Sequence, residues 1–496
     1  MNRQIRRVAV AMGVLILALL VNLNYVQVVK ADDYRNNKNN RRVILNEYAT
    51  PRGQIIAQGG TPIAESVATT DELKYLRRYP NGPLYAPLTG YYSFVYGKDG
   101  LESTEGDVLS GNDPRLFASR LADILTGRNP KGGSVTLTVN KAAQAAAYKG
   151  LGNRPGAVVA LDPATGAILA AVSTPSYDPN ALSAHNANSV VAEWTKLIGD
   201  PKNPLLNRAF QQSYPPGSIF KVVDAAAALK AAKKPSDRIP APDVLKLPAG
   251  GTMTNFAGER CGDGKTDTFV HALTISCNTA FGQLCVHIGQ PIVQDTASLF
   301  GMDNSSRQVP LAIARSTMGE IEDGSALAQS CIGQRNVQMT PLQAAMLSAV
   351  AANDGRLMQP YLVQQQRTPN LSVLANTEPK QLSEVLSPDE DKLLRDMMQS
   401  VVTDPHGTGT QAQIPGVTVG GKTGTADNGP VDANGNYLKA PHAWFTGYAL
   451  DPTHPIAVAV VLENAGVTGS ESAGGTAAAP IARDVMKAYL DDTRGQ

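Results

Sequence analysis

Residues 214–221 read Tyr-Pro-Pro-Gly-Ser-Ile-Phe-Lys. The prolines and the glycine predict a turn, and an apolar run with helical spacing follows it to about residue 234. Ser218 therefore lies in the first turn of a predicted helix, with Lys221 three residues further along the same face. A serine hydroxyl needs a neighbouring base to act as a nucleophile, and a helix start or burial lowers the pKa of a lysine. The spacing predicts Ser218 as a nucleophile and Lys221 as its proton acceptor, although a serine capping an ordinary helix is the simpler interpretation of this motif alone.

Two further short motifs follow in the chain. Residues 276–278 read Ser-Cys-Asn just before a predicted helix, and residues 421–425 read Gly-Lys-Thr-Gly-Thr on a predicted strand. Residues 416–423 also match the phosphate-loop pattern Gly-x4-Gly-Lys-Thr. A phosphate loop must open a helix, whereas a turn at 427–430 follows here, so the sequence predicts no ATP site.

Composition limits the other function classes. The chain has 496 residues with Lys+Arg 44 against Asp+Glu 43, and this balance gives no reason to expect a nucleic-acid partner. The six histidines are scattered and no Cys-x-x-Cys occurs, so no metal site is predicted. The four cysteines, Cys261, Cys277, Cys285 and Cys331, allow two disulfides in three pairings.

The N-terminus predicts a membrane anchor. Arginines in residues 1–7 precede an apolar run at 8–29, whose 22 residues would span about 33 Å as a helix. The arginines place residues 1–7 in the cytoplasm and the remainder outside. A cleaved signal peptide is the alternative, because the strictly apolar core at 8–21 is short, but no small-x-small cleavage site follows it.

Residues 30–150 contain no catalytic constellation and are predicted to form an elongated, non-catalytic pedestal domain. Residues 151–496 combine strands at both ends with a mostly helical stretch that extends to about residue 350. This order predicts an α+β domain, with an antiparallel sheet flanked by helices and a helical subdomain. The predicted strands cover residues 157–161, 167–172, 417–422, 443–450 and 456–462, and the later helices cover 341–346, 388–402 and 480–490.

Together, and in this order, the three motifs resemble those of the serine acyltransferases that recognise penicillin. The one departure is Cys277, at the middle position of the second motif. Pro51–Arg52–Gly53, Gly100–Leu101–Glu102 and the hairpin at 162–166 extend the resemblance over nearly the whole chain. The chain thus resembles the monofunctional class B penicillin-binding proteins, and within them the actinobacterial penicillin-binding protein A group.

The resemblance implies a penicillin-binding transpeptidase fold and a peptidoglycan D,D-transpeptidase activity that β-lactams block covalently. It implies stem peptides, β-lactams, the membrane and a cell-wall synthesis or division complex as partners, and no cofactor. The catalytic domain would lie outside the cell. A D,D-carboxypeptidase, a β-lactamase or β-lactam sensor, and a non-catalytic assembly factor are the alternatives.

The resemblance also implies roles for individual residues. Ser218 would attack the stem peptide, Lys221 would take its proton, and Ser276 would pass a proton to the leaving D-alanine. The backbone N–H groups of Ser218 and Thr425 would form the oxyanion hole. The implied catalytic residues are Ser218, Lys221, Ser276 and Lys422, and the implied substrate-binding residues are Asn278, Thr423, Gly424 and Thr425. A disulfide between Cys261 and Cys277, 16 residues apart, would pin the second motif.

Overall fold

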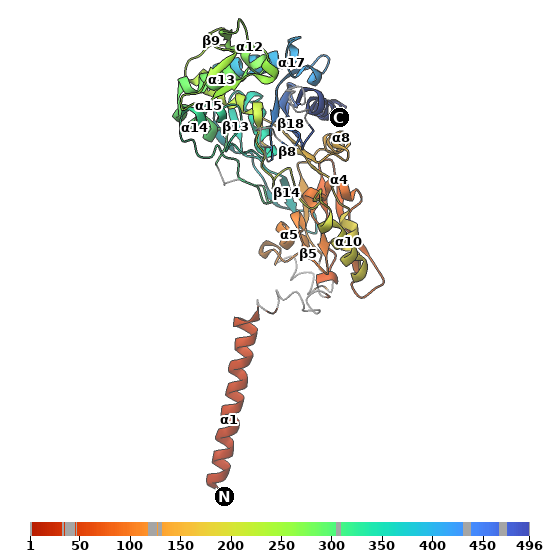
Figure 1. The fold of residues 1–496 in the computed structure, drawn as a ribbon. Coiled ribbons are helices and arrows are strands. Elements are labelled where there is room, and N and C mark those ends of the chain that lie inside the picture. Colours follow the sequence, from red (N-terminus) through yellow and green to blue (C-terminus); the bar gives the residue numbers. More distant parts are fainter. Residues whose placement is uncertain are drawn as a thin grey trace.

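The computed structural model describes residues 2–31, 34, 45, 47–117, 126, 131–303, 309–429, 438–465 and 474–495. An N-terminal helix, a pedestal and a larger α/β domain follow one another along the molecule (Figure 1). The helix α1 (Asn2–Asn24) continues into a π-helical segment, η1 (Tyr25–Val29). The span Arg3–Val29 is long and apolar enough to cross a membrane, and it contains the predicted anchor at 8–29.

The larger domain is built on a five-stranded sheet in the order β17-β18-β19-β7-β8. Every neighbouring pair is antiparallel, as the sequence predicts. Nearly all residues of these strands are buried, because helices cover both faces of the sheet. The strands are β7 (Gly156–Leu161), β8 (Ile168–Thr174), β17 (Thr418–Ala426), β18 (His442–Leu450) and β19 (Ile456–Leu462).

Helices from distant parts of the chain cover the two faces. On one face α8 (Lys141–Leu151) and α18 (Ala479–Arg494) pack against each other and against the sheet. On the other face lie α16 (Pro341–Ala351) and α17 (Pro388–Thr403), with α11 (Lys221–Lys230) packed against α17. The predicted antiparallel sheet flanked by helices is therefore confirmed.

A lobe of short helices lies beyond α11 and agrees only partly with the sequence prediction. Its helices are α12 (Phe269–Thr274), α13 (Asn278–Ile288), α14 (Gln290–Leu299) and α15 (Gly324–Ser330). The mostly helical prediction is wrong for residues 238–268, where β9 (Arg238–Pro240) pairs with β12 (Thr266–Thr268) and β10 (Val244–Lys246) pairs with β11 (Thr252–Thr254). These three-residue strands are separated by prolines and glycines, which exclude a long helix, and they are too short to show a period.

The pedestal contains a six-stranded sheet in the order β15-β14-β6-β1-β2-β3. Strand β14 pairs antiparallel with β6, although more than two hundred residues separate the two strands in the sequence. The polypeptide of the larger domain therefore completes the sheet of the pedestal. Its strands are β1 (Ile55–Ala57), β2 (Thr61–Ala68), β3 (Tyr75–Arg78), β6 (Ser134–Leu137), β14 (Val363–Arg367) and β15 (Val373–Asn376).

A buried ion cluster joins three segments of the pedestal. The fully buried Glu102 accepts hydrogen bonds from Arg77 Nε at 2.6 Å and from Arg52 Nε at 3.0 Å. Burial by itself would raise the pKa of Glu102, but the two guanidinium groups overcome this effect and hold the pKa below its usual value. The Glu102 carboxylate is therefore ionised and paired with both guanidinium groups.

Removing the carboxylate should destabilise the pedestal strongly. The substitution Glu102→Ala leaves the buried Arg77 without its counter-charge and leaves Arg52 only its longer pair with Glu47 (3.7 Å), and we expect it to lower the free energy of unfolding by about 3–5 kcal/mol. Asp396→Ala is the control, because it breaks an exposed pair with Lys392 (3.1 Å), and exposed pairs of this i,i+4 type contribute about 0.3–0.5 kcal/mol. Chemical denaturation of both variants is the measurement, and similar small losses would contradict the prediction.

Candidate active site

The serine of the first motif lies in a tight turn against the edge of the sheet. Ser218 belongs to a 3-10 helix, η3 (Gly217–Phe220), which leads directly into α11, as the predicted helix start requires. Gly217 has a φ of 55°, and a Cβ there would lie 2.3 Å from the carbonyl oxygen of Thr425. Only glycine therefore allows this turn to approach β17 so closely.

Lys221 brings the first and second motifs together. Its side chain is fully buried, and its Nζ lies 3.0 Å from Ser218 Oγ. The same amine donates to the carbonyl oxygen of Ser276 (2.7 Å), to Ser276 Oγ (3.1 Å) and to Asn278 Oδ1 (2.7 Å). Ser276 has a φ of 65°, an unusual value for a residue with a side chain and one that typically marks functional sites. Two hydroxyls and one amine from distant segments thus meet at a single point.

The third motif lies on β17, which packs against the serine turn. Lys422 is fully buried. One of the contacts of its Nζ is a hydrogen bond to the carbonyl oxygen of Thr423 at 3.0 Å. A Cβ on Gly424 would come within 2.9 Å of both Pro216 O and Ile219 Cγ2, so the strand can lie against the turn only with glycine there. Thr425 is half-buried, next to Gly217. The structure therefore places six of the eight predicted residues at or against the serine turn and Lys221, whereas Lys422 and Thr423 directly precede Gly424 on β17.

One residue at this site was missed by the sequence analysis. Thr408, in the loop after α17, accepts a hydrogen bond from Thr423 Oγ1 at 2.6 Å. Its backbone N–H donates to the carbonyl oxygen of Thr274, two residues before Ser276. Thr408 thus bridges the second and third motifs. The only signal in the sequence is its position between Gly407 and Gly409, and such a pattern is common in ordinary loops.

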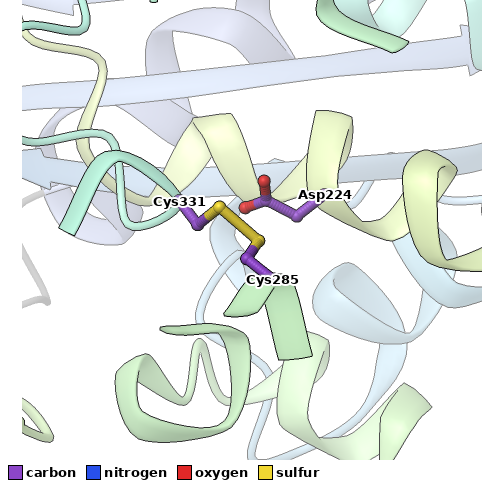
Figure 2. A group of neighbouring side chains, drawn as sticks. All are labelled: Asp224, Cys285 and Cys331. Atoms are coloured by element: carbon purple, nitrogen blue, oxygen red, sulfur yellow. A yellow bond between two sulfur atoms is a disulfide. The ribbon is translucent and has the colours of Figure 1, made fainter. Parts of the chain in front are cut away.

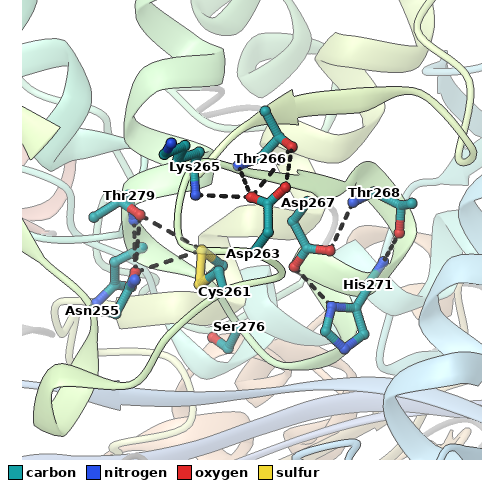
Figure 3. Close-up of a disulfide and its surroundings, with 12 residues drawn as sticks. Asn255, Cys261, Asp263, Lys265, Thr266, Asp267, Thr268, His271, Ser276 and Thr279 are labelled. Atoms are coloured by element: carbon teal, nitrogen blue, oxygen red, sulfur yellow. Dashed lines mark hydrogen bonds and ion pairs between the residues drawn. A yellow bond between two sulfur atoms is a disulfide. The ribbon is translucent and has the colours of Figure 1, made fainter. Parts of the chain in front are cut away.

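Disulfides hold the lobe that carries the second motif. Cys261 and Cys277 are bonded with an S–S distance of 2.08 Å (Figure 3), and Cys285 is bonded to Cys331. Asn255 Oδ1 accepts from the backbone N–H of Thr279 at 3.0 Å and fixes the start of α13 beside the first disulfide. Cys277 therefore points its sulfur toward Cys261, while Ser276 and Asn278 on either side contact Lys221.

A buried carboxyl group lies one helical turn beyond Lys221. Asp224 lies beside the Cys285–Cys331 disulfide (Figure 2), and both of its carboxyl oxygens lack a hydrogen-bond partner among the described residues. The three side chains come close enough to suggest a metal site, but metals bind thiolates, and these two sulfurs are bonded to each other. Burial raises the pKa of Asp224 well above its usual value, although the nearby Lys221 lowers it in part. The carboxyl group is therefore held in its neutral form.

Neutral Asp224 has a consequence for the pH dependence of stability. The unfolded chain releases this proton near the ordinary aspartate pKa of about 3.9, whereas the folded chain keeps it. The folded state then binds more protons, so its stability falls as the pH rises above about 4. Asp224→Asn removes this titration. In thermal unfolding at pH 5 and pH 8, the wild type should lose stability relative to Asp224→Asn at the higher pH, and an unchanged difference would contradict the assignment.

Comparison with known protein families gives two matches. A model described as the penicillin binding protein transpeptidase domain matches residues 156–487. A second model, described as the penicillin binding protein A dimerisation domain, matches residues 52–135. The first match contains all eight predicted site residues, and the second lies within the pedestal.

Individual proteins give the same result. The chain is 44% identical over 496 residues to the peptidoglycan D,D-transpeptidase PbpA of Mycolicibacterium smegmatis, with 99% of each chain covered. It is 42% identical to PbpA of Mycobacterium tuberculosis H37Rv, again over 99% of each chain. Its structure is similar to that of penicillin-binding protein A from M. tuberculosis in a ceftriaxone acyl-enzyme complex, with a TM-score of 0.85, 41% identity, and 90% of this chain and 100% of that chain covered. The penicillin G acyl-enzyme complex gives a TM-score of 0.83 at 41% identity, over 89% of this chain and 100% of that chain.

Proposed function

Because the chain belongs to the class B penicillin-binding proteins, we propose that it is a peptidoglycan D,D-transpeptidase that cross-links stem peptides through an acyl-enzyme on Ser218. The observation that carries this proposal is the contact of the buried Lys221 amine with both Ser218 Oγ and Ser276 Oγ. This arrangement provides a nucleophile, a base and a second hydroxyl within one chain of hydrogen bonds. β-Lactams acylate the same serine and so block the reaction.

Lys221 takes the proton as Ser218 Oγ attacks the carbonyl carbon of the penultimate D-alanine. A carbon–oxygen bond forms and the carbon–nitrogen bond to the terminal D-alanine breaks. Ser276 contacts Lys221 at 3.1 Å, so it can pass this proton to the departing amine. An amine of a second stem peptide then attacks the ester, releases Ser218 and completes the cross-link.

The third motif holds the substrate. The buried ammonium group of Lys422 and the hydroxyls of Thr423 and Thr425 attract the carboxylate of the terminal D-alanine. Thr408 adds a hydroxyl that is joined to Thr423 at 2.6 Å. Asn278 contacts the substrate amide, and the backbone N–H groups of Ser218 and Thr425 stabilise the oxyanion. The close packing of Gly217 against Thr425 supports this last role, because it places the residue before Ser218 directly beside Thr425.

Acylation by a fluorescent penicillin tests the assignment of nucleophile and base. Ser218→Ala should abolish covalent labelling, because no other hydroxyl replaces the attacking group. Lys221→Ala should fold and acylate about 10²–10⁴-fold more slowly, the usual cost of losing a general base. Lys230→Ala is the matched control, since this lysine lies at the other end of α11 and donates to Val385 O. Persistent labelling of Ser218→Ala would refute the proposal.

Product analysis separates the remaining enzyme activities. With a stem-peptide substrate and an amine acceptor, a transpeptidase forms the cross-linked product, whereas a D,D-carboxypeptidase forms only the hydrolysed peptide. A β-lactamase would release hydrolysed penicillin with many turnovers per molecule. A non-catalytic assembly factor would give none of these products and no labelling.

The same proposal assigns a position in the cell. Residues 1–7 lie in the cytoplasm, 8–29 span the membrane once, 30–150 form the pedestal, and 151–496 form the extracytoplasmic transpeptidase domain. The exceptions are β14 and β15, which complete the pedestal sheet, and α8, which packs on the sheet of the larger domain. The candidate span in α1 and the arginines before it support this arrangement, and the pedestal is a suitable surface for a cell-wall synthesis or division complex. An alkaline phosphatase fused after residue 50 should be active, and an inactive fusion would contradict the orientation.

A further inference from the structure

The residue that opens the serine turn is tied to an ion pair. Tyr214 lies four residues before the nucleophile, is only 3% exposed, and donates its hydroxyl to Glu463 Oε1 at 2.8 Å. Arg208 Nε donates to the same carboxylate oxygen, also at 2.8 Å. The buried side chains of Tyr214 and Arg208 therefore meet at one carboxylate, that of the partly exposed Glu463.

The two charged residues, Glu463 and Arg208, are each held by further hydrogen bonds. Glu463 follows β19 directly, and its backbone N–H donates to Pro155 O, next to β7. Arg208 donates through Nη1 to Asn203 O at 3.1 Å and through Nη2 to Lys202 O at 2.7 Å. The carboxylate that receives the Tyr214 hydroxyl is therefore held by the central sheet and not by a free loop.

The rest of the turn is fixed in a similar way. Tyr214 exchanges two backbone hydrogen bonds with Met339, at 3.0 and 2.8 Å. Trp444 Nε1 donates to Pro215 O at 3.0 Å, and the Trp444 ring meets the Tyr214 ring edge-on at 5.9 Å. Gly217 N donates to Gly333 O at 3.0 Å. Tyr214, Pro215 and Gly217 lead directly into Ser218, and the side chain of Tyr214 connects this turn to a charge.

We infer that Tyr214, Glu463 and Arg208 act together as positioning residues that hold the Ser218 hydroxyl in line with Lys221. Tyr214 begins the segment that ends at Ser218, so the effect of the three side chains passes through the backbone of the turn. Ser218 Oγ must lie within reach of Lys221 Nζ while its N–H faces the oxyanion, and a misplacement of about 1 Å costs on the order of 10²-fold in rate. This inference rests on the proposed function and extends it.

The test separates binding from chemistry. In the full-length chain in detergent, the rate constant of acylation by a fluorescent penicillin and the dissociation constant of the preceding complex are measured for Tyr214→Phe, which removes one oxygen atom. We expect the rate constant to fall about 10-fold, part of the cost of a misplaced nucleophile, with the dissociation constant within about twofold of wild type. Labelling should still reach completion, which distinguishes this result from the total loss expected for Ser218→Ala.

Three further variants make the test specific. Glu463→Gln keeps an oxygen acceptor without its charge, and combining it with Tyr214→Phe should slow acylation no further than Tyr214→Phe alone, because both act through one bond. If Tyr214→Phe fails to fold, the single variant Glu463→Gln is tested in its place. Tyr448→Phe is the matched control, since it removes a buried hydroxyl that donates to Arg395 O at 2.9 Å in the same domain.

Three outcomes would overturn the inference. The first is acylation of Tyr214→Phe, or of Glu463→Gln in its place, at a rate within twofold of wild type. The second is an equal loss of rate in Tyr448→Phe, which would indicate a general loss of stability. The third is a weaker complex with an unchanged rate constant, which would indicate that the Tyr214 hydroxyl contacts the ligand directly.

Discussion

The burial of the Lys221 amine is the constraint on which the rest of the structure depends. An amine without solvent needs oxygen partners, and here they come from Ser218, Ser276 and Asn278. These partners belong to two segments almost sixty residues apart, so the helical lobe must pack against the serine turn and α11 for the amine to have all its partners. The disulfide at Cys277 and the unusual backbone of Ser276 then serve to keep that packing in one geometry.

Two fully buried carboxyl groups show how strongly the neighbouring side chains determine the pKa of a buried acid. Glu102 receives hydrogen bonds from two guanidinium groups, and its pKa is lowered. Asp224 has a lysine in its vicinity but no hydrogen-bond partner among the described residues, and its pKa is raised. The pedestal therefore keeps an ionised carboxylate for its architecture, while the domain with the candidate site keeps a neutral acid beside its buried amine.

The parts of the fold that could be predicted are those marked by a pattern of neighbouring residues in the sequence. The sequence predicts β19 at 456–462 with the bounds that the structure has, because apolar residues and flanking turn residues coincide there. The predicted strand at 417–422 ends four residues before β17 does. Gly424 resembles the start of a turn, but in the structure the pairing with β18 continues to Ala426. The pedestal sheet could not be predicted, since β14 joins it from a distant segment. At the site the three motifs were visible, but Thr408 depends on a long-range contact that leaves no local pattern.

The contact between the serine turn and β17 also limits how this protein can evolve. Backbone atoms touch directly at Gly217 and Gly424, and a Cβ on Gly333 would lie 2.0 Å from the carbonyl oxygen of Gly217. A side chain at any of these three positions would meet a backbone oxygen, so the turn and its neighbours would have to move to accept it. The sequence of the serine turn is therefore constrained by backbone contacts as well as by chemistry, and a change in drug response at these positions would require a change in the backbone itself.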